Sequence, residues 1–113
     1  MHELSVAMGI VEIAEQEAAK AQIETFTAID LEIGMLAGIE FDALDFAWPA
    51  AVKNTVLQNA ERRIHKIPAR AKCGDCDHEF PVQQVYDDCP ACGSYLKNVF
   101  QGKELRVRSL DFD

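Results

Sequence analysis

Four cysteines are the feature that most constrains the fold of this 113-residue chain. They stand in two C-x2-C pairs, Cys73 with Cys76 and Cys89 with Cys92, and twelve residues separate the pairs. Two such pairs in one short segment bring four thiolates together from two tight turns, which is the ligand set of a tetrahedral metal site. Two disulfides or four free thiols are the alternatives. The lack of a secretion signal and a reducing cytosol favour a metal, with zinc ahead of iron. A closed four-thiolate site has no open position for a substrate, so we expect it to be structural.

Charge and hydropathy narrow the class of partner. The chain has 19 acidic and 11 basic residues and a net charge of -8. This sign works against binding to nucleic acid or to an anionic membrane, both of which need a basic surface. No run of about 18 apolar residues is present, so no membrane-spanning segment is expected. The first residues lack the basic and apolar regions of a signal peptide, and a cytoplasmic location is predicted.

Hydrophobic periodicity predicts two helices and three strands outside the cysteine segment. Apolar residues recur at helical spacing in two segments, the second of which contains Pro49, and they alternate with polar residues in three others. Phe46 and Trp48 are expected in the core, and the first strand is expected to be half-buried. The predicted helices cover residues 4–21 and 40–53, and the predicted strands cover residues 25–33, 60–67 and 103–112.

These elements predict an α+β fold. We expect a small mixed sheet of about three strands packed with two helices, plus an inserted four-cysteine lobe that resembles a zinc ribbon. The first domain would consist of residues 1–68 together with residues 101–113, and the zinc-binding lobe of residues 69–100. Because the last strand follows the lobe and returns to the first domain, the lobe is predicted to lie between two strands of the main sheet.

The amino terminus is a second candidate metal site. Met1, His2 and Glu3 directly precede the first predicted helix. A bulky second residue should leave Met1 in place, so the α-amine, the His2 imidazole and a backbone amide nitrogen form one chelating unit. Glu3 can add its amide or its carboxylate. Square-planar nitrogen donors suit Ni(II) and Cu(II). The alternative is a terminal histidine of no consequence beside an acid that complements the helix dipole.

Several motifs together resemble one known family. Besides Met1-His2-Glu3-Leu4-Ser5, the chain contains Leu31-Glu32-Ile33-Gly34 and the knuckles Cys73-Gly-Asp-Cys76 and Cys89-Pro-Ala-Cys92-Gly-Ser. With these motifs the chain resembles the HypA/HybF family of nickel metallochaperones, which act in [NiFe]-hydrogenase maturation. The resemblance covers essentially the whole length.

The resemblance implies two metal sites with different roles. Transported Ni(II) would be bound by the Met1 amine, His2 and Glu3, and structural Zn(II) by Cys73, Cys76, Cys89 and Cys92. It also implies a cytosolic carrier that works with a nickel-handling GTPase and passes nickel to the hydrogenase large subunit. Recipients other than hydrogenase and a weak homodimer are left open.

Other functions remain alternatives at this stage. The knuckles are also similar to those of rubredoxins, which carry electrons on iron, and to those of zinc-ribbon adaptors. No nucleophile–base pair, glycine-rich phosphate loop or carboxylate dyad is recognisable, so we do not expect an enzyme. His65 and His78 are expected at the surface, although His78 could relay metal. Glu40 is expected to be a helix-start acid that could lie near the N-terminal metal.

Overall fold

A computed structural model describes residues 2–113 and divides the chain into two compact units. The first unit contains residues 2–32, Ile39–His65 and Arg106–Asp113. The second unit contains Ile33–Gly38 and Lys66–Leu105. The chain therefore passes between the units more than once, and neither unit is one continuous segment.

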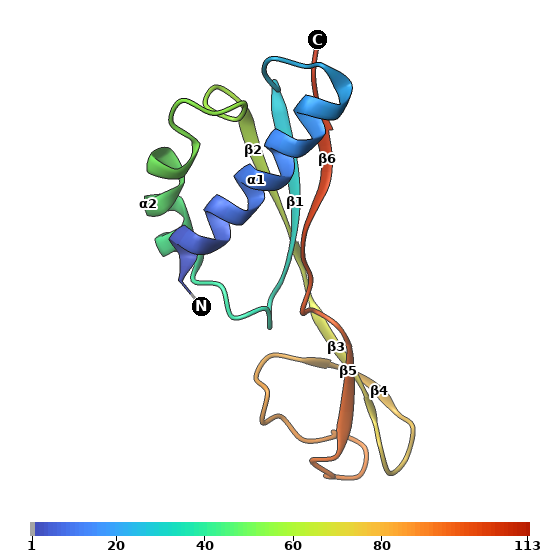
Figure 1. Ribbon diagram of the computed structural model, residues 1–113. Helices are drawn as coiled ribbons and strands as arrows, with labels where there is room; N and C mark the ends of the chain where they lie inside the picture. Colours follow the sequence, from blue (N-terminus) through green and yellow to red (C-terminus); the bar gives the residue numbers. More distant parts are fainter. Residues whose placement is uncertain (1) are drawn as a thin grey trace. The chain divides into compact units, whose positions relative to one another are not determined.

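The elements follow one another in the predicted order, with two helices and two three-stranded sheets (Figure 1). The strand order is β2-β1-β6 in one sheet and β4-β3-β5 in the other. All strands of the second sheet thus lie in the chain between β2 and β6, which confirms the predicted insertion. The bounds are α1 Glu3–Ala21, β1 Ala28–Gly34, α2 Phe41–Val52, β2 Glu61–Ile67, β3 Ala69–Cys73, β4 Glu79–Val82, β5 Lys97–Gln101 and β6 Leu105–Asp111.

Backbone hydrogen bonds show that strands β1 and β2 run parallel. At one end Glu61 N donates to Thr27 O over 2.9 Å, and at the other end Met35 N donates to Ile67 O over 2.9 Å. Parallel neighbours need a crossover connection, and α2 supplies it.

Strands β1 and β6 run antiparallel, because Thr27 N donates to Asp111 O and Gly34 N donates to Glu104 O, each over 2.8 Å. The sheet is therefore mixed, as expected. The predicted α+β fold class is confirmed.

The core of the first unit forms between α1, α2 and the first sheet. One face of α1 is buried, as its helical periodicity predicts. The helix ends at Gln22, which has a left-handed φ of 58° and donates its backbone N–H to Ala18 O and Ala19 O. The buried apolar residues are Val6, Ala7, Ile10, Val11, Ala14, Ala18, Phe26, Ala28, Ile29, Leu31, Leu44, Trp48, Val52 and Leu57.

Two expectations for this unit were wrong. Strand β1 is buried on both faces and not half-buried, because side chains from β2 and β6 cover Asp30 and Glu32 on its polar face. Phe46 is 89% exposed and lies outside the core.

Trp48 is buried as expected, with the Arg62 guanidinium 5.0 Å from its ring centre. Helix α2 runs through Pro49.

The second unit is an antiparallel sheet with its own small core. Strand β3 pairs with β4 on one side and with β5 on the other. The buried residues come from the two strands β3 and β4 and from the cysteine loop, with Leu36 and Val99 packed against them. Leu36 N donates to Gly102 O over 2.7 Å, which ties residues 33–38 to this unit. The buried set is Ala69, Ala71, Cys73, Phe80, Val82 and Cys89.

No helix in the described range, residues 2–113, has the length and apolar character needed to cross a membrane.

Candidate metal centre

The four cysteine side chains converge in the second unit. Cys73 ends strand β3, Cys76 lies in the turn that follows, and Cys89 and Cys92 lie in the loop between β4 and β5. Their Sγ atoms all lie within 4.8 Å of one another. The Cys73 and Cys92 sulfurs are 3.6 Å apart and the Cys76 and Cys89 sulfurs 3.7 Å apart.

These spacings fit a four-thiolate metal site and not two disulfides. A bonded sulfur pair is about 2.05 Å apart, and all four cysteines are unbridged. A tetrahedron with Zn–S bonds of about 2.3 Å has edges of about 3.8 Å, which matches the observed sulfur pairs. Among residues 2–113, these four form the one group of three or more His, Cys, Asp or Glu side chains close enough to hold a metal.

Backbone amides hydrogen-bond to a sulfur in the first knuckle, and a backbone hydrogen bond closes a tight turn in the second. Asp75 N and Cys76 N each donate to Cys73 Sγ over 3.4 Å. In the second knuckle Gly93 N donates to Cys89 O over 2.7 Å. Gly93 has a φ of +79°, a conformation that other residues rarely adopt. These local interactions help to hold the four cysteines close together.

The thiols differ in their pKa values. Hydrogen bonds from the backbone of Cys76 and then of Asp75 lower the pKa of Cys73 to about 7. The Ser94 backbone also lowers the pKa of Cys92, but the neighbouring Cys73 and Cys76 thiols outweigh it and raise that pKa to about 12. Four thiolates cannot all be charged this close together without a cation. A bound cation would therefore displace protons from the site.

Two of the four cysteines are buried and two are exposed. Cys73 and Cys89 belong to the buried core of the unit, whereas Cys76 and Cys92 are exposed. All four sulfurs would be used as ligands by one ion, which leaves no position for a substrate. The arrangement therefore suits a metal that holds the loops together.

The N-terminal candidate is described from His2 onward, and Met1 lies outside the described residues. His2 is the N-cap of α1, with φ -80° and ψ 122°, and its side chain makes no capping hydrogen bond. Its imidazole is exposed. The backbone carbonyl of His2 accepts a hydrogen bond from Val6 N over 3.1 Å, which fixes the segment at the helix start.

Glu3 connects the two helix starts of the first unit. Its Oε2 accepts a hydrogen bond from Glu40 N over 3.2 Å. Glu40 is the N-cap of α2, as its expected role as a helix-start acid requires. The contact places Glu40 beside the N-terminal segment. No periodicity in the sequence could have signalled it, because 37 positions separate the two residues.

The two remaining histidines differ in their surroundings. His78 is exposed, and its ring stacks on Phe80 with centroids 6.3 Å apart. His65 is not a plain surface residue, because its Nε2 lies 2.8 Å from Asp30 Oδ1. Neither side chain joins the cysteine group.

Residues 1–112 match the protein family described as hydrogenase/urease nickel incorporation, metallochaperone, hypA. The chain belongs to the HypA family. This confirms the resemblance seen in the motifs and makes the chain a member of a family of nickel metallochaperones.

Curated HypA proteins are similar over their whole length. The chain is 42% identical over 110 residues to hydrogenase maturation factor HypA of Parabacteroides distasonis, covering 97% of this chain and 96% of the relative. It is 41% identical over 113 residues to hydrogenase maturation factor HypA of Geobacter metallireducens, and the match covers both chains completely.

Solved HypA structures have the same fold. The solution structure of the Ni metallochaperone HypA from Helicobacter pylori matches with a TM-score of 0.71 and 26% identity, covering 98% of this chain and 97% of that one. A second HypA solution structure matches with a TM-score of 0.70 and 27% identity, covering 98% and 95%.

Proposed function

We propose that this chain binds Ni(II) through the Met1 amine, His2 and Glu3 and delivers it during [NiFe]-hydrogenase maturation, while Cys73, Cys76, Cys89 and Cys92 hold a structural Zn(II). The partners would be a nickel-handling GTPase and the hydrogenase large subunit, in the cytoplasm. The family description also names urease, so a urease apoprotein is a second candidate recipient. A weak homodimer stays a prediction.

The exposed imidazole of His2 at the start of α1 is the observation that carries the nickel proposal. It has no capping partner within the fold, so nickel binding would displace no structural hydrogen bond of this side chain. Exposed donors also allow a recipient to replace them one at a time. The hydrogen bond from Glu40 N occupies one Glu3 carboxylate oxygen and leaves the Glu3 amide as the simpler nitrogen donor.

The nickel proposal is tested with His2→Ala, and His78→Ala is the matched control because both histidines are exposed. Calorimetric titration of untagged protein with Ni(II) should show one tight site in the parent chain and in the control. The His2→Ala variant should lose that site and keep its zinc content and circular dichroism spectrum. An unchanged nickel titration of His2→Ala would refute the assignment.

A peptide tag placed before Met1 provides an independent check. It converts the terminal amine to an amide and should weaken nickel binding as His2→Ala does. Because the donors must lose protons before they bind, nickel affinity should also fall as the pH is lowered. If the tagged protein binds nickel as well as the untagged protein does, the terminal amine is not a ligand.

The identity of the structural metal is tested by elemental analysis of the protein as purified. One zinc per chain and no visible absorption band are expected. Iron in the site, with the colour of an iron–thiolate centre, would instead favour the rubredoxin-like electron carrier.

A further inference from the structure

Strand β6 leaves one edge of the first sheet without a partner. In the sheet order β2-β1-β6 it is the last strand, and within residues 2–113 only β1 pairs with it. An unpaired edge presents a row of backbone N–H and C=O groups that can bond to another extended chain. β6 is seven residues long and carries no proline, so every residue of the strand has a backbone N–H.

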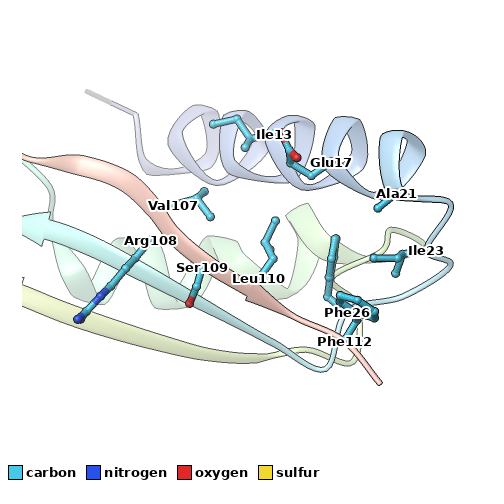
Figure 2. Close-up of a pocket in the computed structure, with 10 residues that line it drawn as sticks. All are labelled: Ile13, Glu17, Ala21, Ile23, Phe26, Val107, Arg108, Ser109, Leu110 and Phe112. Atoms are coloured by element: carbon cyan, nitrogen blue, oxygen red, sulfur yellow. The ribbon is translucent and has the colours of Figure 1, made fainter.

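An apolar groove runs beside this edge, between α1 and β6. It encloses about 410 Å³. Figure 2 shows Val107 and Leu110 lying between β6 and α1, with Ile13 above them on the helix and Phe112 at one end. Ile13 and Phe112 are exposed although both are large and apolar. A side chain from an added strand would find apolar contacts here.

The side of β6 opposite the groove carries two exposed arginines. Arg106 and Arg108 both pair with one carboxylate, that of Glu32, and their side chains remain 65% and 54% exposed. Figure 2 shows Arg108 pointing away from α1. Two guanidinium groups share one carboxylate on the face opposite the groove. An acidic side chain would complement this face, although the chain as a whole has a net charge of -8.

Most registers of the edge against a second copy of β6 are unfavourable. In a two-fold antiparallel pair, hydrogen-bonded residues face hydrogen-bonded residues, so one residue must lie opposite its own copy. Centring the pair on Arg106 or Arg108 places identical charges opposite each other, and centring it on Val107 places Arg106 opposite Arg108. Centring it on Ser109 places Val107 opposite Asp111. These four registers are unfavourable. A pair centred on Leu110 would place Ser109 opposite Asp111, so a second copy in that register is one outcome of the test below.

We propose that β6 accepts an extended acidic segment of a partner protein as an added strand. Backbone hydrogen bonds to the edge would supply much of the affinity, as in other cases of strand addition. Apolar residues on one face of the segment would enter the groove, and acidic residues on the other face would meet Arg106 and Arg108. This surface uses neither His2 nor the cysteines and is independent of the nickel proposal.

The test uses the full zinc-loaded chain and a blocked peptide of the same length as β6, in which valine alternates with aspartate. Amide hydrogen exchange measured by NMR should slow in β6 when the peptide is added, and shifts should concentrate at Val107, Leu110 and Ile13. A peptide with lysine in place of aspartate should bind about tenfold more weakly or not at all. The double variant Arg106→Glu, Arg108→Glu should weaken binding of the acidic peptide by a similar factor.

Matched variants separate the surface from general effects. Lys53→Glu makes the same kind of charge change at an exposed site outside β6, and it should leave binding unchanged. Val107→Lys should block the groove, whereas Phe46→Lys should have no effect. His2→Ala should bind the peptide normally, which keeps failure of this proposal distinct from failure of the nickel site.

Three results would overturn the proposal. One is the absence of any exchange protection at about 1 mM acidic peptide. Another is protection confined to strands other than β6. The third is protection of β6 that appears without peptide as the protein concentration rises, since a second copy would then occupy the edge.

Discussion

Asp30 is a nearly buried carboxylate, 8% exposed, in the middle of β1. Arg63 donates to both of its oxygens, over 3.0 and 2.9 Å, and Ser109 Oγ donates over 2.9 Å. The Arg63 hydrogen bonds, then those of His65 and Ser109, hold the pKa of Asp30 well below its usual range. The same pairing raises the pKa of Arg63. These contacts join β2 and β6 to β1 by side chains as well as by backbone.

Asp30→Asn should therefore lower the melting temperature, by an amount on the order of 5 °C, because it leaves Arg63 without its main partner. The folded-state pKa of Asp30 is depressed, so its stabilisation is complete above the unfolded pKa of about 3.9 and is lost as the pH falls below that value. The difference in melting temperature between parent and variant should thus shrink at acidic pH.

Thermal unfolding followed by circular dichroism from about pH 7 down to pH 3 measures this, with the exposed Asp88→Asn as control. A constant difference across the whole range would mean that the charge of Asp30 is not what stabilises the fold.

Among single residues, the sequence predicted those whose role follows from their spacing along the chain. The cysteine group was predicted from two C-x2-C pairs, and the structure brings all four side chains together. The partners of Asp30 could not be predicted, because Arg63 is 33 positions away and Ser109 is 79 positions away. Phe46 was misplaced because an apolar residue within a helix pattern does not reveal which neighbours are available to cover it.

The backbone of Gly34, at the end of β1, packs directly against the backbone of the connection between β5 and β6. A Cβ atom on Gly34 would lie 2.0 Å from Gly102 O and 2.6 Å from Lys103 N, both of them backbone atoms that cannot move independently. Gly102 itself has a φ of +110° and lies against Ala69. Both glycines are required by close packing of backbone on backbone.

Gly34→Ala should destabilise the protein by several degrees in melting temperature, or prevent folding, because the backbone must separate to admit one methyl group. Gly9→Ala is the matched control. Gly9 lies in α1 with no atom within 4 Å of an added Cβ, so alanine there should stabilise by about 0.5–1 kcal/mol. Urea denaturation of the two variants measures the contrast. Equal effects of the two substitutions would show that the Gly34 backbone is not in close contact with the β5–β6 connection.

At the level of elements, periodicity predicted helices and strands within a few residues of their observed bounds. Apolar spacing of 3.6 and of 2 marks α1 and β1 because each is long enough to repeat its pattern. Strands β3, β4 and β5 were expected only as short strands beside the knuckles. Their pairing depends on residues such as Leu36, which no local pattern assigns to the second unit.

The two units have separate cores, and only one of them contains the thiolate group. If the thiolate group holds the proposed structural metal, chelation should unfold the second unit, where metal-binding energy would be folding energy. Both helices belong to the first unit. The helical circular dichroism signal should persist after treatment with a strong zinc chelator, while NMR signals of Ala71 and Phe80 lose their dispersion.

Cys89→Ser should reproduce the chelated state without any reagent. Ser94→Ala, outside the proposed ligand set, should keep both its bound metal and the dispersed signals. Loss of the helical signal together with the metal would show that the two units unfold as one.

The strand order β2-β1-β6 has a consequence for synthesis. Residues 105–111 leave the ribosome after all four cysteines, yet they form one edge of the first sheet. A nascent chain that stops before them already contains all four cysteines, so metal capture at the cysteine group can come first and closure of the first unit afterwards. Translation order thus allows the cysteine group to bind its metal before the first sheet has its last strand.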